Sequence, residues 1–168
     1  MTSVLLFSAF SKTGKTTFLR ELIPFFVQKG IPVGYIKHHH GNYYGKREKD
    51  TAVIHQAGVR RTILVAEDAV VIEDPPPSES CQDPIHTIVK HYFDGYPIVF
   101  VEGYKNDRIY PKVVLLRKLD EDEKSLLHHP NIIAVITDKK LSLPCPVYGF
   151  DEKMRFFKYI TTYFHLAV

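Results

Sequence analysis

Short apolar runs alternate along the chain with segments of helical periodicity. The apolar runs predict strands at residues 4–8, 33–37, 62–65, 69–72, 98–101, 113–116 and 132–136. Helical spacing of apolar positions predicts helices at residues 16–29, 84–93, 120–127 and 151–164. Strands that alternate with helices are typical of an α/β layer fold with a mostly parallel sheet, here expected as one domain over residues 1–168.

Local signals set the ends of several elements. Gly30 is expected to end the first helix, and Pro24 inside that helix predicts a kink or an early end because proline lacks an N–H. Asp83 before Pro84 is expected to cap the second helix, and Asp120 with Glu123 the third. Residues 38–49 are polar and predict a loop or an exposed hairpin after the second strand, followed by a short helix over residues 50–57.

Composition is that of an ordinary globular protein. Of 168 residues, 45% are hydrophobic and 24% are charged, which excludes disordered, collagen-like and disulfide-scaffold classes. The formal net charge of +3 is too small to predict nucleic-acid binding. The chain has two isolated cysteines and no secretory leader pattern, which favours a cytoplasmic protein. It has no apolar run of about 18 residues, so we expect no membrane span.

A phosphate-binding loop is the most informative motif. Residues 9–17 read Ala-Phe-Ser-Lys-Thr-Gly-Lys-Thr-Thr between the first strand and the first helix, and end as the pattern G-x-x-x-x-G-K-[ST] does. Backbone N–H groups and the helix dipole there favour an anion. We expect Ser11, Lys12, Thr13 and Gly14 to surround the phosphates, Lys15 to bridge the β- and γ-phosphates, Thr16 to bind Mg²⁺ and Thr17 to contact the α-phosphate.

The loop departs from its pattern at one position. Ala9 stands where the pattern has its first glycine, and its methyl group restricts the backbone angles but need not abolish the loop.

Acidic residues complete the predicted metal site. Glu102 follows the buried run 98–101, at the edge of an open α/β sheet where ligands bind. A carboxylate there can hold Mg²⁺ directly or through water, and Asp50 can orient water or support the metal.

These residues together resemble the MobB-type adaptor family of molybdopterin-guanine dinucleotide biosynthesis. The combination of Lys-His-His, Ala-Gly and Val-Glu-Gly-Tyr-Lys is more specific than the phosphate loop, and the order and spacing agree over most of residues 1–140. The segments that carry the resemblance are residues 11–17, 33–41, 50–51, 55–58, 101–105 and 111–113.

The resemblance implies a P-loop NTPase fold that binds GTP with Mg²⁺ and hydrolyses it slowly at most. It also implies a homodimer that assists a MobA-type guanylyltransferase in attaching GMP to the molybdenum cofactor. By the same likeness Asp50 and Glu102 fall at the acidic metal-site positions, and Lys15 and Asp50 are the residues that would act in hydrolysis.

Guanine recognition has one candidate residue. The chain has no Asn-Lys-x-Asp motif, but Asp138 follows a buried strand and can accept from guanine N1–H and N2–H. The alternative is an ordinary polar turn after a strand.

Histidines and cations leave further alternatives open. His38, His39 and His40 suggest a metal site, a positive rim or a solvated loop, although adjacent strand residues alternate faces. Seven cations are expected at the same edge, where they would favour a pterin phosphate: Lys37, Lys46, Arg47, Lys49, Lys105, Arg108 and Lys112.

Two other functions share parts of this pattern. A small-molecule kinase needs an arginine-rich lid, for which Arg60, Arg61 and Arg108 are the candidates. A nucleotide-dependent metallochaperone would use the histidine run, but Cys145-Pro146 is followed by Val147 rather than by a histidine.

Overall fold

The structure is a computed structural model, and it describes residues 2–38, 54, 57–59, 61–77 and 81–167. The chain divides into two compact units, one of residues 1–39 with 91–168 and one of residues 40–90. The two units are groups of residues that make most of their contacts within the group. The single domain expected from the sequence stays a prediction.

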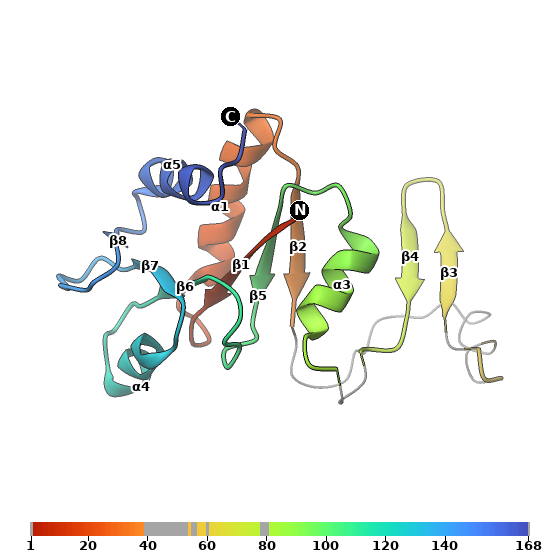
Figure 1. Cartoon of the computed structure of the whole chain (residues 1–168), viewed down its shortest axis with the longest axis horizontal. Coiled ribbons are helices and arrows are strands. Elements are labelled where there is room, and N and C mark those ends of the chain that lie inside the picture. The colour runs from red at the N-terminus through yellow and green to blue at the C-terminus, as the bar shows by residue number, and fades with distance from the viewer. Residues whose placement is uncertain (1, 39–53, 55–56, 60, 78–80, 168) are drawn as a thin grey trace. The chain divides into compact units, whose positions relative to one another are not determined.

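A six-stranded sheet in the order β2-β5-β1-β6-β7-β8 forms the centre of the first unit (Figure 1). All of its strand pairs are parallel, so the carboxyl ends of the strands lie at one edge. The predicted α/β fold with a mostly parallel sheet is therefore confirmed. The strands are β1 (Ser3–Ser8), β2 (Val33–Lys37), β5 (Ile98–Glu102), β6 (Lys112–Leu115), β7 (Ile132–Ile136) and β8 (Val147–Tyr148).

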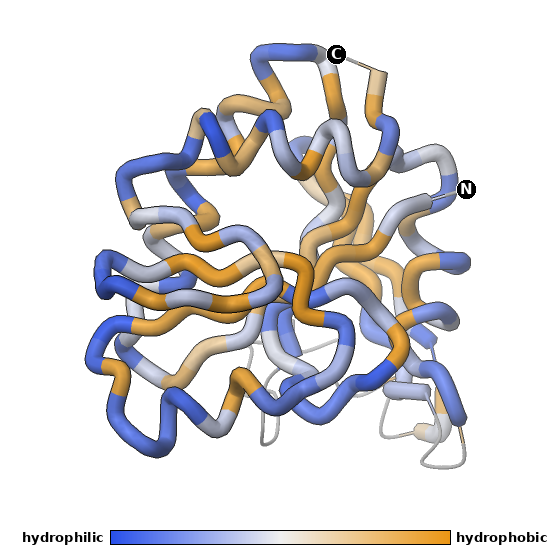
Figure 2. The backbone as a smooth tube through the Cα atoms, turned by 60° about the vertical axis from the view of Figure 1, so that its left-hand side comes forward, coloured by the Kyte–Doolittle hydropathy of each residue, from blue (hydrophilic) through white to orange (hydrophobic). Residues whose placement is uncertain are grey.

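One face of this sheet packs against α1 (Lys15–Gln28) and α5 (Lys153–Tyr163). Aromatic rings fill the layer between them: the Phe26 ring lies 5.3 Å from that of Phe100 and 4.8 Å from that of Phe157. Figure 2 shows the apolar stretches converging on the central strands. Burying side chains of this size stabilises the fold by about 1.5–3 kcal/mol each.

The opposite face of β6 and β7 packs against a shorter helical segment. Val114, Leu116 and Val135 form a second apolar cluster with Leu126. Leu126 opens the 3₁₀ turn Leu126–His128, which follows α4 (Glu121–Ser125). Helical segments thus lie on both faces of the sheet, as a three-layer arrangement requires. None of the described helices is long and apolar enough to cross a membrane.

The first helix does not end early at Pro24. α1 continues through this residue to Gln28, because Phe18 and Leu22 before it and Phe26 after it are all buried. Packing on both sides outweighs the loss of one helical hydrogen bond. Gly30 follows the C-cap Lys29 with a left-handed φ of 70° and stops the helix as predicted, and its N–H donates to the carbonyl oxygen of Val27 at 2.9 Å.

The second unit contains the predicted strand pair. β3 (Thr62–Val65) and β4 (Val70–Glu73) are antiparallel. α3 (Pro84–Tyr92) begins in this unit, and the carboxylate of Asp83 accepts from the N–H of His86 at 2.8 Å, which confirms the predicted cap. The predicted loop over residues 38–49 and helix over residues 50–57 lie outside the described residues, apart from His38, Ile54 and Ala57.

The turn between β6 and α4 is built around one buried carboxylate. Glu123 Oε2 accepts from the backbone N–H groups of Arg117, Lys118 and Leu119 at 2.9, 2.8 and 2.8 Å. The N–H of Glu123 in turn donates to the carboxylate of Asp120 at 2.9 Å, so the predicted cap is confirmed. These bonds fix the backbone from which the Arg117 side chain extends.

We predict that Glu123→Gln lowers the free energy of unfolding by about 1–2 kcal/mol, because a neutral amide replaces a charged acceptor of three hydrogen bonds. Glu121→Gln on the same helix, where the carboxylate is exposed and pairs with Lys124, is the matched control and should change stability by less than about 0.5 kcal/mol. Urea unfolding of both variants measures the difference, and equal effects would contradict this role of Glu123.

Candidate nucleotide-binding site

Residues 9–14 form a turn between β1 and α1 at the carboxyl edge of the sheet, and residues 15–17 begin the helix. Gly14 precedes α1 with a φ of 93°, and Lys12 has a φ of 65°. The Thr13 hydroxyl closes the turn by donating to the carbonyl oxygen of Phe10 at 2.9 Å. Left-handed residues beside a helix N-terminus turn successive N–H groups toward one side, which is the geometry that binds phosphate.

Glycine is needed in this turn at Gly14 but not at Ala9. A residue with a side chain would be strained at the φ of Gly14. Ala9 is not among the described residues with a left-handed backbone, and its methyl group is buried in the core cluster with Leu5 and Phe7. Ala9, which stands in place of the first glycine of the pattern, therefore contributes an apolar contact to the core.

Glu102 contacts two residues of the phosphate loop. Its Oε1 lies 3.3 Å from Lys15 Nζ, and its Oε2 accepts from the Thr16 hydroxyl at 3.4 Å. The side chains of Lys15 and Glu102 are only 15% and 10% exposed. Because Phe7 of β1 pairs with Glu102 of β5, the sheet register brings this carboxylate beside the loop.

Tyr35 of β2 also contacts this carboxylate, and the sequence analysis did not identify it. Its hydroxyl donates to Glu102 Oε2 at 2.7 Å. Lys37 pairs with Glu102 across β2 and β5, so Tyr35, two residues earlier, lies on the same face of the sheet. The alternation of side chains along β2 was the signal that could have identified Tyr35. It indicates a contact with Glu102 only once β2 is known to lie beside β5.

The contacts keep Glu102 ionised. Burial alone would raise the pKa of its carboxyl, but the Tyr35 hydroxyl, the Lys15 ammonium and the charge of Lys37 outweigh burial and hold this pKa below its usual range. Burial and the neighbouring carboxylate raise the pKa of Tyr35, which stays a neutral donor. The site therefore contains an ionised carboxylate in direct contact with the Lys15 ammonium.

The segment after β5 is packed against the end of β2. The N–H of His38 donates to the carbonyl oxygen of Glu102 at 2.8 Å, and the His38 ring stacks on Tyr104 with centroids 4.3 Å apart. Gly103 has a φ of 108°, and a Cβ there would lie 2.8 Å from that of His38. Lys105 Nζ lies 4.5 Å from the centre of the Phe10 ring, beside the phosphate loop.

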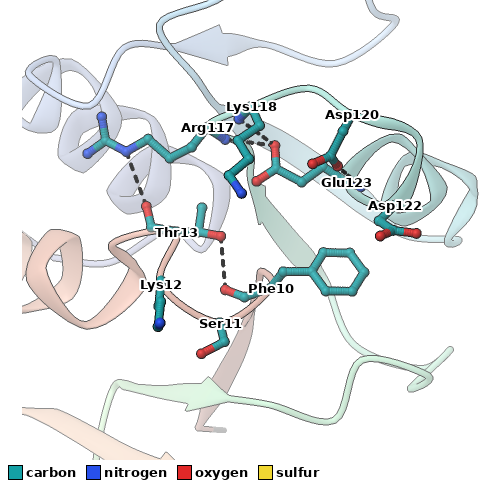
Figure 3. Close-up of a pocket in the computed structure, with 9 residues that line it drawn as sticks. All are labelled: Phe10, Ser11, Lys12, Thr13, Arg117, Lys118, Asp120, Asp122 and Glu123. Atoms are coloured by element: carbon teal, nitrogen blue, oxygen red, sulfur yellow. Dashed lines mark hydrogen bonds between the residues drawn. The ribbon is translucent and has the colours of Figure 1, made fainter.

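A cavity of about 220 Å³ lies beside the phosphate loop (Figure 3). It does not include Lys15, Thr16 or Glu102, so it is distinct from the contact that these residues form. The side chains of Ser11 and Lys12 are exposed next to it. Its lining residues are Phe10, Ser11, Lys12, Thr13, Arg117, Lys118, Asp120, Asp122 and Glu123.

Asp138 lies directly after β7 and close to the loop through Arg117. Its Oδ2 lies 3.2 Å from Arg117 Nη1, and its Oδ1 accepts from the N–H of Phe150 at 2.9 Å. Arg117 Nε donates to the carbonyl oxygen of Thr13 at 3.2 Å. Arg117 was missed in the sequence because a single arginine after a strand has no distinctive pattern.

Lys112 was predicted wrongly as part of a phosphate-binding rim. Its side chain is fully buried at the start of β6, and its Nζ donates to the carbonyl oxygens of Lys105 and Asp107 at 2.8 and 2.9 Å. Burial lowers the pKa of this ammonium, although Asp107 opposes the shift. Lys112 therefore fixes the loop between β5 and β6 and does not face a ligand.

Several other candidates lie outside the described residues: Asp50, His39, His40, Lys46, Arg47, Lys49 and Arg60. Arg61, a lid candidate for a kinase, pairs with Asp74 at 2.6 Å. Within the described part of the chain, no three His, Cys, Asp or Glu side chains come together as a metal site.

A parallel sheet, a phosphate loop from β1 into α1 and an acid at the end of the adjacent strand define an α/β protein of the P-loop NTPase type. Comparison with known sequences gives the family. The family model described as "MobB: Molybdopterin guanine dinucleotide synthesis protein B" matches residues 4–138, and this chain belongs to that family.

Individual relatives agree with this assignment. The molybdopterin-guanine dinucleotide biosynthesis adapter protein of Escherichia coli is 33% identical over 85% of this chain and 82% of its own length. The adapter protein of the same name from Haemophilus influenzae is 34% identical over 66% of this chain and 61% of its own length. The crystal structure of a MobB protein homolog from Bacillus stearothermophilus superposes with a TM-score of 0.69 at 25% identity, over 98% of this chain and 99% of that chain.

We predict that Tyr35→Phe raises the pKa of the Glu102 carboxyl, because the variant lacks the hydroxyl that stabilises the carboxylate. A lowered folded-state pKa contributes stability above the ordinary carboxyl value of 4.5, and this stability is lost as the pH falls through the lowered pKa. The variant should therefore lose less stability on acidification than the wild type.

Carboxyl-carbon NMR titration of Glu102 and unfolding measured against pH test both statements. Tyr163→Phe, at an exposed tyrosine of α5, is the control for loss of a phenol hydroxyl. An unchanged pKa in Tyr35→Phe would contradict the proposed effect of this hydrogen bond.

Proposed function

We propose that this chain is a cytoplasmic, GTP-binding adapter for the guanylyltransferase step of molybdopterin-guanine dinucleotide biosynthesis. The main support is the contact of Glu102 with Lys15 and Thr16 at the strand-to-helix turn. The names of the relatives, which are adapter proteins of that pathway, support the biological role.

Nucleotide binding requires the Lys15–Glu102 ion pair to open. The Lys15 ammonium then binds the β- and γ-phosphates, where it stays paired with negative charge. Glu102 and the Thr16 hydroxyl are released as oxygen ligands of the kind that Mg²⁺ prefers, either directly or through water. Ser11, Lys12, Thr13 and Gly14 surround the phosphates, Thr17 contacts the α-phosphate, and Asp50 orients water or supports the metal. Bound Mg²⁺ supplies charge neutralisation of the phosphates.

The arrangement favours binding over rapid hydrolysis. Glu102 keeps the hydrogen bond from the Tyr35 hydroxyl when Lys15 moves to the phosphates, and this bond lowers the pKa of the carboxyl and makes it a weak proton acceptor. A carboxylate held in this way positions a metal ion better than it activates water. We infer slow GTP hydrolysis at most.

The partner in this proposal is a MobA-type guanylyltransferase, and the chain acts as a homodimer near molybdopterin or the molybdenum cofactor. Lys37 and Lys105 lie at the same edge of the sheet as the phosphate loop and would favour the phosphate of a pterin. Capture of the guanylyltransferase by the wild-type chain, measured with and without GTP and Mg²⁺, tests the partner. Failure to capture it under both conditions would contradict the adapter role.

We predict that Lys15→Ala lowers the affinity for GTP with Mg²⁺ by about tenfold to a hundredfold, because a hydrogen-bonded charge at the phosphates is lost. Lys29→Ala, which removes an exposed lysine beyond the other end of α1, is the matched control and should leave the affinity unchanged. Isothermal titration calorimetry measures both. Absence of GTP binding by the wild type at about millimolar concentration, the weak end of specific affinities, would reject the function.

A further inference from the structure

Arg117 is held flat and rigid beside the phosphate loop. Its guanidinium carbon lies 3.6 Å from the centre of the Phe150 ring, so the two planar groups stack. Its Nε donates to the carbonyl oxygen of Thr13, and its Nη1 pairs with Asp138, both at 3.2 Å. A guanidinium with an aromatic ring beneath it and two hydrogen bonds at its edges has little freedom left to lose when a ligand binds.

The support beneath Arg117 is part of the core. Phe150 is buried, and its ring meets the ring of Phe18 of α1 edge to face at 6.0 Å. The side chain of Arg117 is nevertheless 47% exposed and that of Asp138 55%. With one guanidinium face on Phe150, the exposed area includes the opposite face, and Asp138 lies at the edge of this plane.

This surface begins where the phosphate loop ends. Arg117 Nη2 lies 3.5 Å from the place that a Cβ of Gly14 would occupy, and Gly14 is the residue before α1. Figure 3 shows Arg117 reaching from the β6 side to Thr13, with its guanidinium directed away from Glu123. When the phosphates of a nucleotide occupy the loop, the base lies beyond one of its ends. At the end next to α1, the planar cation of Arg117 is available to contact a base.

We propose that Arg117 is the surface on which the purine base of the bound nucleotide stacks and that Asp138 selects guanine at its edge. This inference rests on the proposed GTP-binding function. An ionised carboxylate only accepts hydrogen bonds. Guanine presents adjacent N1–H and 2-amino donors, whereas adenine presents an acceptor at N1, so Asp138 matches guanine and opposes adenine.

Asp138 is already oriented for this role. The N–H of Phe150 holds its Oδ1, which leaves Oδ2 on the side of Arg117. Arg117 Nη1 now donates to Asp138 Oδ2, and the N1–H and 2-amino group of guanine are hydrogen-bond donors that this carboxylate can accept in the same way. On binding, the base takes over this donation to Asp138, while Arg117 keeps its contacts with Thr13 and Phe150.

A different role for the same contacts is a purely structural one. Arg117 connects the phosphate loop, through Thr13, to the segments that carry Asp138 and Phe150. Loss of such a connection would weaken binding of any triphosphate, with or without a base. Inorganic tripolyphosphate with Mg²⁺ has no base and therefore separates the two roles.

The first test exchanges one atom at the base-selecting edge. Asp138→Asn keeps the shape of the side chain but gives it an amide donor, which matches the 2-oxo group of xanthine in place of the 2-amino group of guanine. We expect the affinity for GTP to fall by about tenfold to a hundredfold and the affinity for XTP to rise, with tripolyphosphate affinity unchanged. Asp94→Asn, at an exposed carboxylate that does not belong to this site, should leave the ratio of GTP to XTP affinity as in the wild type. An unchanged ratio in Asp138→Asn would overturn the inference.

The second test removes the stacking surface. Arg117→Ala should lower the affinity for GTP by about tenfold, in line with the loss of one base-stacking partner, and should leave tripolyphosphate affinity unchanged. Arg117→Lys keeps the charge without the plane and should recover less than half of the loss on a logarithmic scale. Equal losses of GTP and tripolyphosphate affinity in Arg117→Ala would show a structural role and overturn the inference.

The wild type separates failure of this inference from failure of the proposed function. If the wild type binds tripolyphosphate and GTP with equal affinity, the proposed base site is wrong, while the proposed phosphate-binding loop is still supported. Binding of neither ligand overturns the proposed function and this inference together.

Discussion

The contact between Glu102 and Lys15 is the interaction on which the candidate site depends. A buried carboxylate is costly unless it is paired and hydrogen-bonded, and here it is both. Glu102 uses Lys15, Thr16 and Tyr35 as partners, which come from α1 and β2. The buried charge is thus compensated, and the Lys15 ammonium and the Thr16 hydroxyl are groups of the kind that bind phosphate or a metal ion in other proteins.

Parallel pairing of the strands makes this contact possible. The register places Phe7 of β1 and Lys37 of β2 on either side of Glu102, so three chain segments far apart in the sequence end at one point. On the other side of β1, the turn anchored by Glu123 directs Arg117 back to the phosphate loop. The carboxyl edge of the sheet therefore carries the Glu102 carboxylate on one side of β1 and the Arg117 guanidinium on the other.

Much of this arrangement could be predicted from the sequence because its signals are local. The apolar run before Ala9 and the glycine and lysine after it predicted the phosphate loop, and a buried run that ends in Glu102 predicted the acid. Tyr35, Arg117 and Phe150 could not be found in the same way, because their roles depend on strand order and on a turn fixed by hydrogen bonds. The wrong prediction for Lys112 has the same cause, since its burial follows from the carbonyl groups around it.

The most direct measurement is a crystal structure of the chain with a non-hydrolysable GTP analogue and Mg²⁺. The account predicts that Lys15 Nζ leaves Glu102 for the β- and γ-phosphate oxygens and that the Glu102 carboxylate faces the metal ion, directly or through one water molecule. A triphosphate bound elsewhere, with the 3.3 Å contact between Lys15 and Glu102 intact, would contradict it.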